Sequence, residues 1–219
     1  MIGILIPAHN EEDLLEDCLQ AALLAAQHER LDGETVEILV VLDSCTDRSS
    51  EIVSTYPVHC LAIEARNVGQ ARAAGAHFLL ERGARWISCS DADSRVAHDW
   101  LVAQLALDVD AVCGTVTVEA WHESFDESAQ IRYHQHYQAR DGHRHIHGAN
   151  LGISAEAYQR AGGFEPLACD EDVQLVRQLE RCGANIAWSH RPQVLTSARL
   201  DSRARGGFGD YLRDLVQAD

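Results

Sequence analysis

The sequence contains no lysine: its 18 basic residues are all arginine, and 34 acidic residues give a formal net charge of -16. The absence of lysine excludes a P-loop lysine on a phosphate, a lysine Schiff base and a pyridoxal-phosphate lysine. The acidic balance disfavours nucleic-acid binding and attachment to an anionic membrane surface, because both call for a basic face. An anionic ligand would have to be bound by arginine, backbone N–H groups, a helix N-terminus or a metal ion.

Long apolar runs and paired cysteines are missing as well. No apolar run approaches the roughly 18 residues of a membrane span, and the chain does not open with a charged start followed by an apolar stretch. We therefore expect no transmembrane segment and no signal peptide. The seven cysteines are widely spaced and include no Cys-x-x-Cys pair, which disfavours a disulfide framework or a zinc knuckle and favours a reducing, cytoplasmic location.

The sequence does contain an alternation of short apolar runs with segments of helical periodicity. The first half predicts strands over residues 2–6, 36–42, 58–63, 86–89 and 111–118, and helices over residues 11–26, 47–54, 68–82 and 97–107. Asn10, followed by three acids, is the expected N-cap of the first helix. Continuous apolar strands alternating with helices predict an α/β fold whose mostly parallel sheet is covered on both faces. The length suits one domain, 1–219.

The second half has a less regular pattern. Residues 121–147 are polar, aromatic and rich in histidine, and we expect a helix near residues 129–139 with a loop after it. The remaining expected elements are helices over 154–161 and 170–181, each followed by glycine, and edge strands over 185–188 and 194–197.

Polar clusters follow three of the predicted strands, at His9-Asn10-Glu11, Asp43 to Asp47 and Asp91 to Asp93. Ligands of such sheets bind beyond the carboxyl ends of the strands, so we expect the three clusters to meet in one cleft. Asp91 and Asp93 flank the small residue Ala92, and two such carboxylates can face a hard cation, Mg²⁺ or Mn²⁺. Taken alone, each cluster is explained equally well by a solvated turn or a helix cap.

Three acids, Asp170, Glu171 and Asp172, open the last predicted helix. A carboxylate within hydrogen-bond reach of an acceptor hydroxyl can take its proton, and like-charged neighbours and partial burial would raise its pKa toward that task. Stabilisation of the helix N-terminus would also account for the three acids without any catalytic role.

Several segments together resemble glycosyltransferase family 2 in order and spacing: Pro7 to Glu12, Asp43 to Asp47, Arg66-Asn67-Val68-Gly69, Asp91 to Asp93 and Glu171-Asp172. The resemblance runs from residue 2 to about residue 200, and His147 to Asn150 and Gly162-Gly163-Phe164 resemble the family's acceptor-side segment. It implies a GT-A fold, a three-layer sandwich in one continuous domain. A Rossmann-like nucleotide-sugar-binding half, about residues 1–118, would be joined to an acceptor-binding half, about residues 119–219.

The resemblance also implies roles for individual residues. Asp172, beside Glu171, would be the catalytic base of an inverting transfer from a UDP- or GDP-sugar to an acceptor hydroxyl; a retaining reaction stays open. Asp93 and Asp91 would bind Mg²⁺ or Mn²⁺, with His190 as first and His147 as second candidate for a further ligand. The nucleotide-sugar-binding residues would be Pro7, Ala8, His9, Glu11, Asp43, Arg66, Gly69, Arg72, Asp91, Ala92 and Asp93.

The sequence departs from part of the family. It lacks the Gln-x-x-Arg-Trp segment and the membrane helices of the processive polysaccharide synthases, which favours a soluble enzyme that adds one sugar or a few. Its tail, with Arg199, Arg203 and Arg205, resembles that of small bacterial members. These arginines would either close over the diphosphate or form a solvated basic tail. Trp121, Tyr133 and Tyr137 would either stack on an acceptor, which the sequence does not identify, or belong to the core.

Three alternative functions stay open. A sugar-phosphate nucleotidyltransferase has a similar front half, but it normally needs a Gly-rich loop and lysine on the triphosphate. A degenerate GT-A-like domain could bind a nucleotide or act as a scaffold without catalysis. A metal-dependent hydrolase could be built on the alternating histidines His143, His145 and His147, which would share one face of an extended segment.

Overall fold

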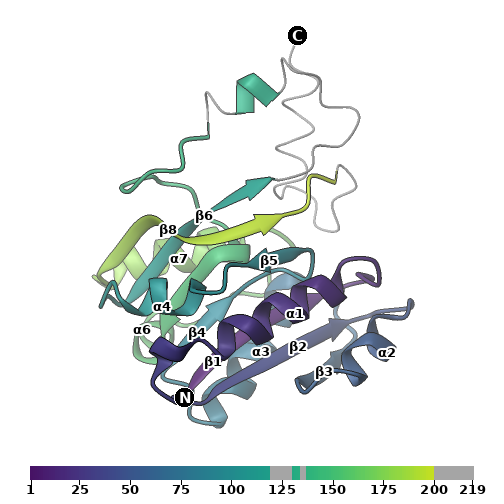
Figure 1. Ribbon diagram of the computed structural model, residues 1–219. Coiled ribbons are helices and arrows are strands. Elements are labelled where there is room, and N and C mark those ends of the chain that lie inside the picture. The colour runs from purple at the N-terminus through teal and green to yellow at the C-terminus, as the bar shows by residue number, and fades with distance from the viewer. Residues whose placement is uncertain (119–129, 134–136, 200–219) are drawn as a thin grey trace.

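The computed structural model describes residues 1–118, 130–133 and 137–199. In this part of the chain, one sheet of eight strands has the order β3-β2-β1-β4-β7-β6-β8-β5 (Figure 1). The strands are β1 (Ile2–Ala8), β2 (Val36–Asp43), β3 (His59–Ile63), β4 (Trp86–Cys89), β5 (Ser94–Val96), β6 (Ala111–Val118), β7 (Leu151–Ser154) and β8 (Ile186–Thr196). The helices are α1 (Leu15–Ala26), α2 (Ser49–Ser54), α3 (Val68–Glu81), α4 (Trp100–Leu105), α6 (Ala155–Ala161) and α7 (Glu171–Arg181), and two short 3-10 turns are η1 (Glu29–Leu31) and η2 (Gly148–Asn150).

The strands of the first half form the parallel part of the sheet, as predicted. β1 pairs in parallel with β2 and β4, and β2 pairs in parallel with β3. Successive side chains of a strand point to opposite faces, so β1 contributes Ile2, Ile4 and Ile6 to one core and Leu5 to the other. A strand buried on both faces reads as a continuous apolar run, which explains why the sequence revealed it.

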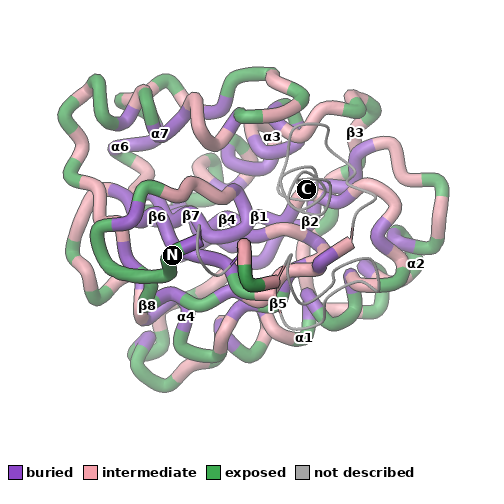
Figure 2. The backbone as a smooth tube through the Cα atoms, turned by 90° about the horizontal axis from the view of Figure 1, so that it is seen from above, coloured by how far each residue is buried: buried purple, intermediate pink, exposed green. Residues whose placement is uncertain are grey.

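Helices cover both faces of the sheet. Helices α1, α2 and α4 pack on one face, and α3, α6 and α7 pack on the other. Figure 2 shows the buried strands between α1 and α4 on one side and α3, α6 and α7 on the other. The chain therefore has the three-layer α/β arrangement that the alternating pattern predicted.

The second half of the sheet differs from the prediction. β7, which was not predicted, inserts between β4 and β6 and is antiparallel to both. The two expected edge strands form one strand, β8, which lies inside the sheet parallel to β6, with an irregular register at Gly114/Thr115. The short β5 is the edge and runs antiparallel to β8. Short strands with mixed polarity carry too little pattern to be recognised from sequence.

The starts of several helices are also corrected. α1 begins at Leu15, because Asn10 has a φ of 54° and its side chain accepts a hydrogen bond from the Thr46 N–H at 2.7 Å. Asn10 is therefore not an N-cap but ties the loop after β1 to the loop after β2. Asn67 caps α3 and Ser154 caps α6, each accepting a backbone N–H of the first turn.

Some predictions fall on residues that lie outside the described part. These are Trp121, Arg203, Arg205 and, in the helix expected near residues 129–139, residues 129 and 134–136. Within residues 1–118, 130–133 and 137–199, no helix is both long enough and apolar enough to cross a membrane.

Candidate active site

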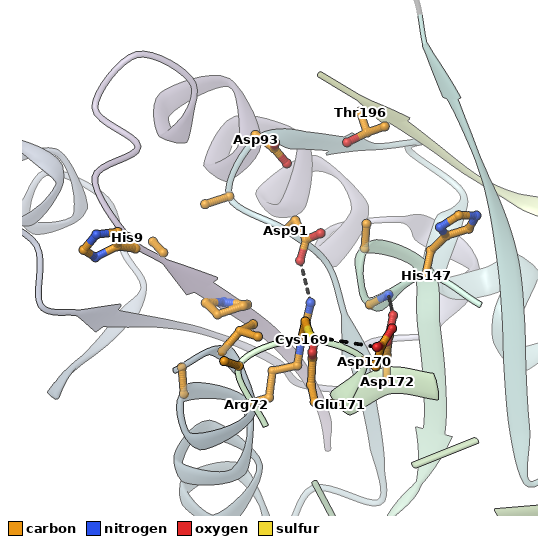
Figure 3. Close-up of a pocket in the computed structure, with 18 of the residues that line it drawn as sticks. His9, Arg72, Asp91, Asp93, His147, Cys169, Asp170, Glu171, Asp172 and Thr196 are labelled. Atoms are coloured by element: carbon orange, nitrogen blue, oxygen red, sulfur yellow. Dashed lines mark hydrogen bonds and ion pairs between the residues drawn. The ribbon is translucent and has the colours of Figure 1, made fainter. Parts of the chain in front are cut away.

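A cavity of about 890 Å³ opens beyond the carboxyl ends of β1, β2 and β4 (Figure 3). The polar clusters that follow these three strands all contribute to its wall, so they meet in one cleft as predicted. Residues from the turn before β7 and from the start of α7 complete the wall. The predicted nucleotide-sugar-binding residues that line it are Pro7, Ala8, His9, Glu11, Asp43, Arg66, Arg72, Asp91, Ala92 and Asp93.

Asp43, the last residue of β2, fixes the loop that leads into α3. Its carboxylate accepts hydrogen bonds from the backbone N–H groups of Ala65, Arg66 and Asn67 at 2.8, 2.8 and 2.7 Å. These bonds hold Arg66 at a φ of 47°, which is uncommon for a residue with a side chain. Burial alone would raise the pKa of Asp43, but the backbone hydrogen bonds outweigh it and lower that pKa. Asp43 therefore organises one edge of the cavity as a carboxylate.

His9 follows β1, and its side chain is held by the end of β2. Its Nδ1 lies 2.6 Å from the backbone carbonyl oxygen of Asp43. A carbonyl oxygen only accepts, so Nδ1 carries a proton, and in the neutral ring Nε2 is then the acceptor. Since His9 lines the cavity, Nε2 is a candidate acceptor for an N–H group of a ligand.

Arg72 forms the buried centre of the site. Its Nε donates to Glu171 at 2.9 Å and its Nη2 donates to Asp91, so it joins α3, the start of α7 and the loop after β4 (Figure 3). Burial would lower the pKa of Arg72, but the carboxylates of Asp91 and Glu171 raise it above its ordinary value. A Cβ at Gly148 would overlap the guanidinium, so only glycine leaves room for Arg72 at this point.

Glu171, predicted to be catalytic beside Asp172, lines the same cavity but has a different partner. Its side chain is 7% exposed and is paired with Arg72. A carboxylate engaged in this way is a counter-ion and not a free base. Glu171 therefore holds Arg72 in position.

Asp93 and Glu11 share a third arginine, Arg199. Nη2 of Arg199 lies 3.1 Å from Asp93 Oδ2, and its two terminal nitrogens both donate to the Glu11 carboxylate. Burial raises the pKa of Asp93 to about 6, with Arg199 acting in the opposite direction. The two carboxylates of the Asp-x-Asp segment are thus each paired with an arginine, Asp91 with Arg72 and Asp93 with Arg199.

The chemistry of these carboxylates fits a hard divalent cation, which prefers oxygen ligands. Asp91, Asp93 and Glu11 line one part of the cavity, and Asp93 is held largely away from water. In the arrangement seen here, however, no group of three His, Cys, Asp or Glu side chains within the described residues is spaced to hold a metal ion. The carboxylates are thus of the right type to bind a divalent cation, but in this arrangement they are paired with arginines.

His190 does not join this group. Its Nδ1 lies 3.0 Å from Asp141 and its exposed ring is not among the residues that line the cavity. The prediction of His190 as a metal ligand is therefore not supported. His190 lies within β8, where its side chain is exposed and contacts Asp141.

His147, the second candidate, does line the cavity. The backbone N–H of Val116 donates to the Tyr137 hydroxyl at 2.8 Å, and that hydroxyl lies 2.9 Å from His147 Nε2. A hydroxyl that accepts from Val116 can still donate or accept once more, so the direction of its bond to Nε2 follows from the His147 tautomer. Burial, with neighbouring histidines, lowers the pKa of His147 to about 3, so the ring is neutral. The Tyr137 hydroxyl thus engages Nε2, and the assignment of His147 as a further metal ligand stays a prediction.

Asp172 stands in the first turn of α7 and faces the cavity. Its Oδ2 accepts from the Gly148 N–H at 2.6 Å and its Oδ1 accepts from its neighbour Val173 at 2.7 Å. Burial and the adjacent charge of Glu171 raise the pKa of Asp172 to about 6. The carboxylate is held in place and is a stronger proton acceptor than an exposed aspartate.

Gly69 has a different role from the one predicted. It is not part of the cavity wall; its N–H donates to the Leu167 carbonyl at 3.0 Å, and a Cβ there would overlap the Glu165 carbonyl oxygen. The glycine lets the start of α3 pack against residues 165–167. The close approach of two backbones, and not a ligand, explains it.

Asn150, which ends the segment that resembles the family's acceptor side, is a supporting residue of the site. Its buried amide donates to the carbonyls of Thr115 and Pro192 at 2.7 and 2.9 Å, and its oxygen accepts from Trp100 Nε1 at 2.9 Å. It thereby anchors η2, whose Gly148 holds Asp172. No local pattern reveals such a role, because all three partners are distant in the chain.

A family model described as glycosyl transferase family 2 matches residues 3–161. The chain belongs to this family. The match covers the strands β1 to β7, the Asp-x-Asp segment and η2, which carry most of the cavity wall. No curated protein sequence was found to match the chain at a significant level.

Solved structures of glycosyltransferases have the same fold. S. aureus TarS 1-349 in complex with UDP-GlcNAc superimposes with a TM-score of 0.69 at 13% identity, covering 98% of this chain and 65% of that one. The mannosyltransferase PcManGT from Pyrobaculum calidifontis, in complex with GDP-Man and Mn2+, gives 0.64 at 17% identity, covering 96% and 59%. The chain therefore spans less than two thirds of the length of these proteins. At such identities the likeness establishes the GT-A fold.

Proposed function

We propose that this family 2 glycosyltransferase transfers a sugar from a UDP- or GDP-sugar to an acceptor hydroxyl, with inversion at the anomeric carbon and Asp172 as the base. The observation that carries the proposal is the presence in one cavity of Asp91 and Asp93 beside Asp172, a held carboxylate with a pKa raised to about 6. The complexes of TarS with UDP-GlcNAc and of PcManGT with GDP-Man and Mn2+ support this donor class.

The donor would occupy the side of the cavity formed by the loops after β1 and β2. His9 offers an acceptor nitrogen there, and the loop that Asp43 orders supplies its wall. The diphosphate would lie near Asp91 and Asp93. Mg²⁺ or Mn²⁺ held by these carboxylates would supply positive charge to the leaving diphosphate.

Asp172 would act on the acceptor. Its carboxylate takes the proton of the hydroxyl while the hydroxyl oxygen forms a bond to the anomeric carbon and the bond to the diphosphate oxygen breaks. The nucleoside diphosphate leaves with the electron pair of that bond. Gly148 keeps Asp172 in position through its N–H, and Glu171 keeps Arg72 beside it.

The test is calorimetric titration of UDP and of GDP, each with and without Mn²⁺, on the wild type and on Asp93→Asn. We expect one nucleotide to bind in a metal-dependent manner and Asp93→Asn to weaken that binding by about tenfold or more, through loss of a charged ligand. Asp108→Asn is the matched control, because Asp108 is outside the cavity and Asn tolerates its φ of 48°.

The two main adverse outcomes have different meanings. Failure of both nucleotides to bind under any condition contradicts the assignment of the donor. Binding that is independent of metal and unaffected by Asp93→Asn, without transfer to any acceptor or hydrolysis of the donor, contradicts the catalytic proposal and points to a nucleotide-binding domain.

A further inference from the structure

The register between β5 and β8 brings the end of the described chain to the Asp-x-Asp segment. Ser94 pairs with Thr196, and the two hydroxyl oxygens are 2.9 Å apart. Asp93 precedes Ser94, and Arg199 follows Thr196 by three residues. Strand pairing, and not a local motif, therefore delivers Arg199 to Asp93.

Arg199 is bound there by two carboxylates. It donates through both terminal nitrogens to Glu11, whose side chain is 6% exposed, and lies 3.1 Å from Asp93, which is 16% exposed. Such bidentate hydrogen bonding is the geometry in which an arginine binds a carboxylate most strongly. One guanidinium thus contacts two acids whose side chains are largely withdrawn from water.

Arg199 differs from Arg72 in its freedom to change partners. Arg72 is buried between Asp91 and Glu171, with a side chain 2% exposed, so it cannot turn without leaving two acids unpaired. The side chain of Arg199 is 25% exposed and follows the last described strand. It lies at the part of the cavity where a cation and a diphosphate would meet.

The cavity needs such an adaptable cation. Among the described residues of its wall, acids outnumber arginines seven to three, and the chain has no lysine. A nucleoside diphosphate adds further negative charge, so its binding requires positive charge at the same point. When no diphosphate is bound, Arg199 pairs with Glu11 and Asp93. One guanidinium serves in both situations if it changes partner.

We propose that Arg199 is a built-in counter-ion that competes with the divalent cation: in the absence of donor it occupies Glu11 and Asp93, and on binding of the cation and the nucleoside diphosphate it leaves Asp93 and pairs with the diphosphate. This inference rests on the proposed function for its second half only. Its first half, competition between Arg199 and a cation, concerns the protein without nucleotide.

The test measures Mn²⁺ binding to the nucleotide-free protein by electron paramagnetic resonance of free Mn²⁺. We expect Arg199→Gln to bind Mn²⁺ about tenfold more tightly than the wild type, because the carboxylates are released from a competing cation. Arg95→Gln is the matched control. Arg95 lies on β5 next to Ser94 but pairs with Asp17 outside the cavity, so its loss should leave the Mn²⁺ affinity unchanged.

Arg199→Lys guards against a misfolded variant. It keeps a charge but not the two-pronged geometry, so its Mn²⁺ affinity should lie between those of the wild type and Arg199→Gln. Unfolding temperatures are measured for all four proteins. Equal or weaker Mn²⁺ binding by a folded Arg199→Gln overturns the competition, and so does an equal gain in Arg95→Gln.

The second half of the inference is tested on the same samples with UDP and GDP. If Arg199 moves to the diphosphate, Arg199→Gln binds Mn²⁺ more tightly but the nucleotide about tenfold more weakly at saturating Mn²⁺. Unchanged nucleotide affinity overturns the movement to the diphosphate. If neither nucleotide binds any of the proteins, the proposed function fails while the Mn²⁺ competition can still be judged.

Discussion

At the scale of single residues, environment separates acids that look alike in the sequence. Glu171 and Asp172 are neighbours, but Glu171 is paired with Arg72, whereas Asp172 accepts from Gly148 and keeps a pKa raised to about 6 by burial and by Glu171. The sequence nominated both. Asp172 accepts from backbone N–H groups and Glu171 is paired with a cation, which is why we propose Asp172 and not Glu171 as the base.

Replacing Asp172 tests its role directly. We expect Asp172→Asn to lower kcat by about 10²–10⁴-fold, because the amide cannot take the hydroxyl proton, while the donor's dissociation constant stays within a few-fold. Asp170→Asn is the control: Asp170 also lines the cavity, and Asn tolerates its φ of 59°. Steady-state kinetics and nucleotide titration measure both. A loss of equal size in Asp170→Asn would count against a specific role for Asp172.

The pH profile gives a second prediction at this scale. A base with a pKa of about 6 must be ionised to work, so kcat/KM should fall as the pH drops below about 6 and level off above it. Because the pKa of Asp93 is also raised to about 6, the profiles are measured at saturating Mn²⁺, where the residual activity of Asp172→Asn should lack this acidic limb. A wild-type profile that stays flat down to pH about 4, where an ordinary aspartate titrates, would be inconsistent with Asp172 as the base.

At the scale of elements, the buried strands were predictable, whereas the start of the first helix was not. β1, β2 and β4 carry continuous apolar runs, which reveal them without their neighbours. Asn10 is of a residue type that is common at N-caps. However, its amide oxygen accepts a hydrogen bond from Thr46 in another loop, and the helix starts at Leu15. β5 and β7 form strands because they pair with neighbouring strands. Segments this short have too little periodicity for such pairing to be predicted from the sequence.

The packing of α3 on the sheet depends on Gly75. A Cβ at this position would overlap Leu5 on β1 and lie 2.9 Å from Val41 on β2. Alanine would favour the helix by about 1 kcal/mol, but overpacking in a core costs about 1–3 kcal/mol. We therefore expect Gly75→Ala to lower the free energy of unfolding, as measured by urea denaturation.

A double-mutant cycle identifies the cause. Leu5→Ala removes the atoms that the new Cβ would meet, so Gly75→Ala should destabilise the Leu5→Ala protein less than it destabilises the wild type. The same loss in both backgrounds would show that the steric argument is wrong.

At the scale of the whole molecule, the formal net charge of -16 opposes the approach of an anionic donor. Salt screens this repulsion beyond about 10 Å, whereas contacts within the cavity are screened much less. The association rate constant of the nucleotide that binds should therefore rise between about 10 and 150 mM NaCl, the reverse of the trend at basic sites. Stopped-flow measurements check this, with the uncharged nucleoside as control. A rate that falls with salt would indicate that the cavity's arginines dominate the approach.

The sequence by itself determined the order of the strands and helices in the first half and the set of polar residues at the strand ends. It could do so because carboxyl ends of parallel strands share one edge, so residues that are separate in the chain must meet there. The family resemblance in turn selected Asp91, Asp93 and Asp172.

Only the tertiary structure decided what each of these residues touches. Arg72 and Glu171 are 99 positions apart, and Arg199 and Glu11 are 188 apart, so their pairing follows from the sheet and not from any local pattern. For the same reason, the sequence did not predict that His190 contacts Asp141 or that Gly69 donates to the backbone carbonyl of Leu167. Charge and hydrogen bonding act over a few ångströms in space, and the fold sets which side chains come within that reach.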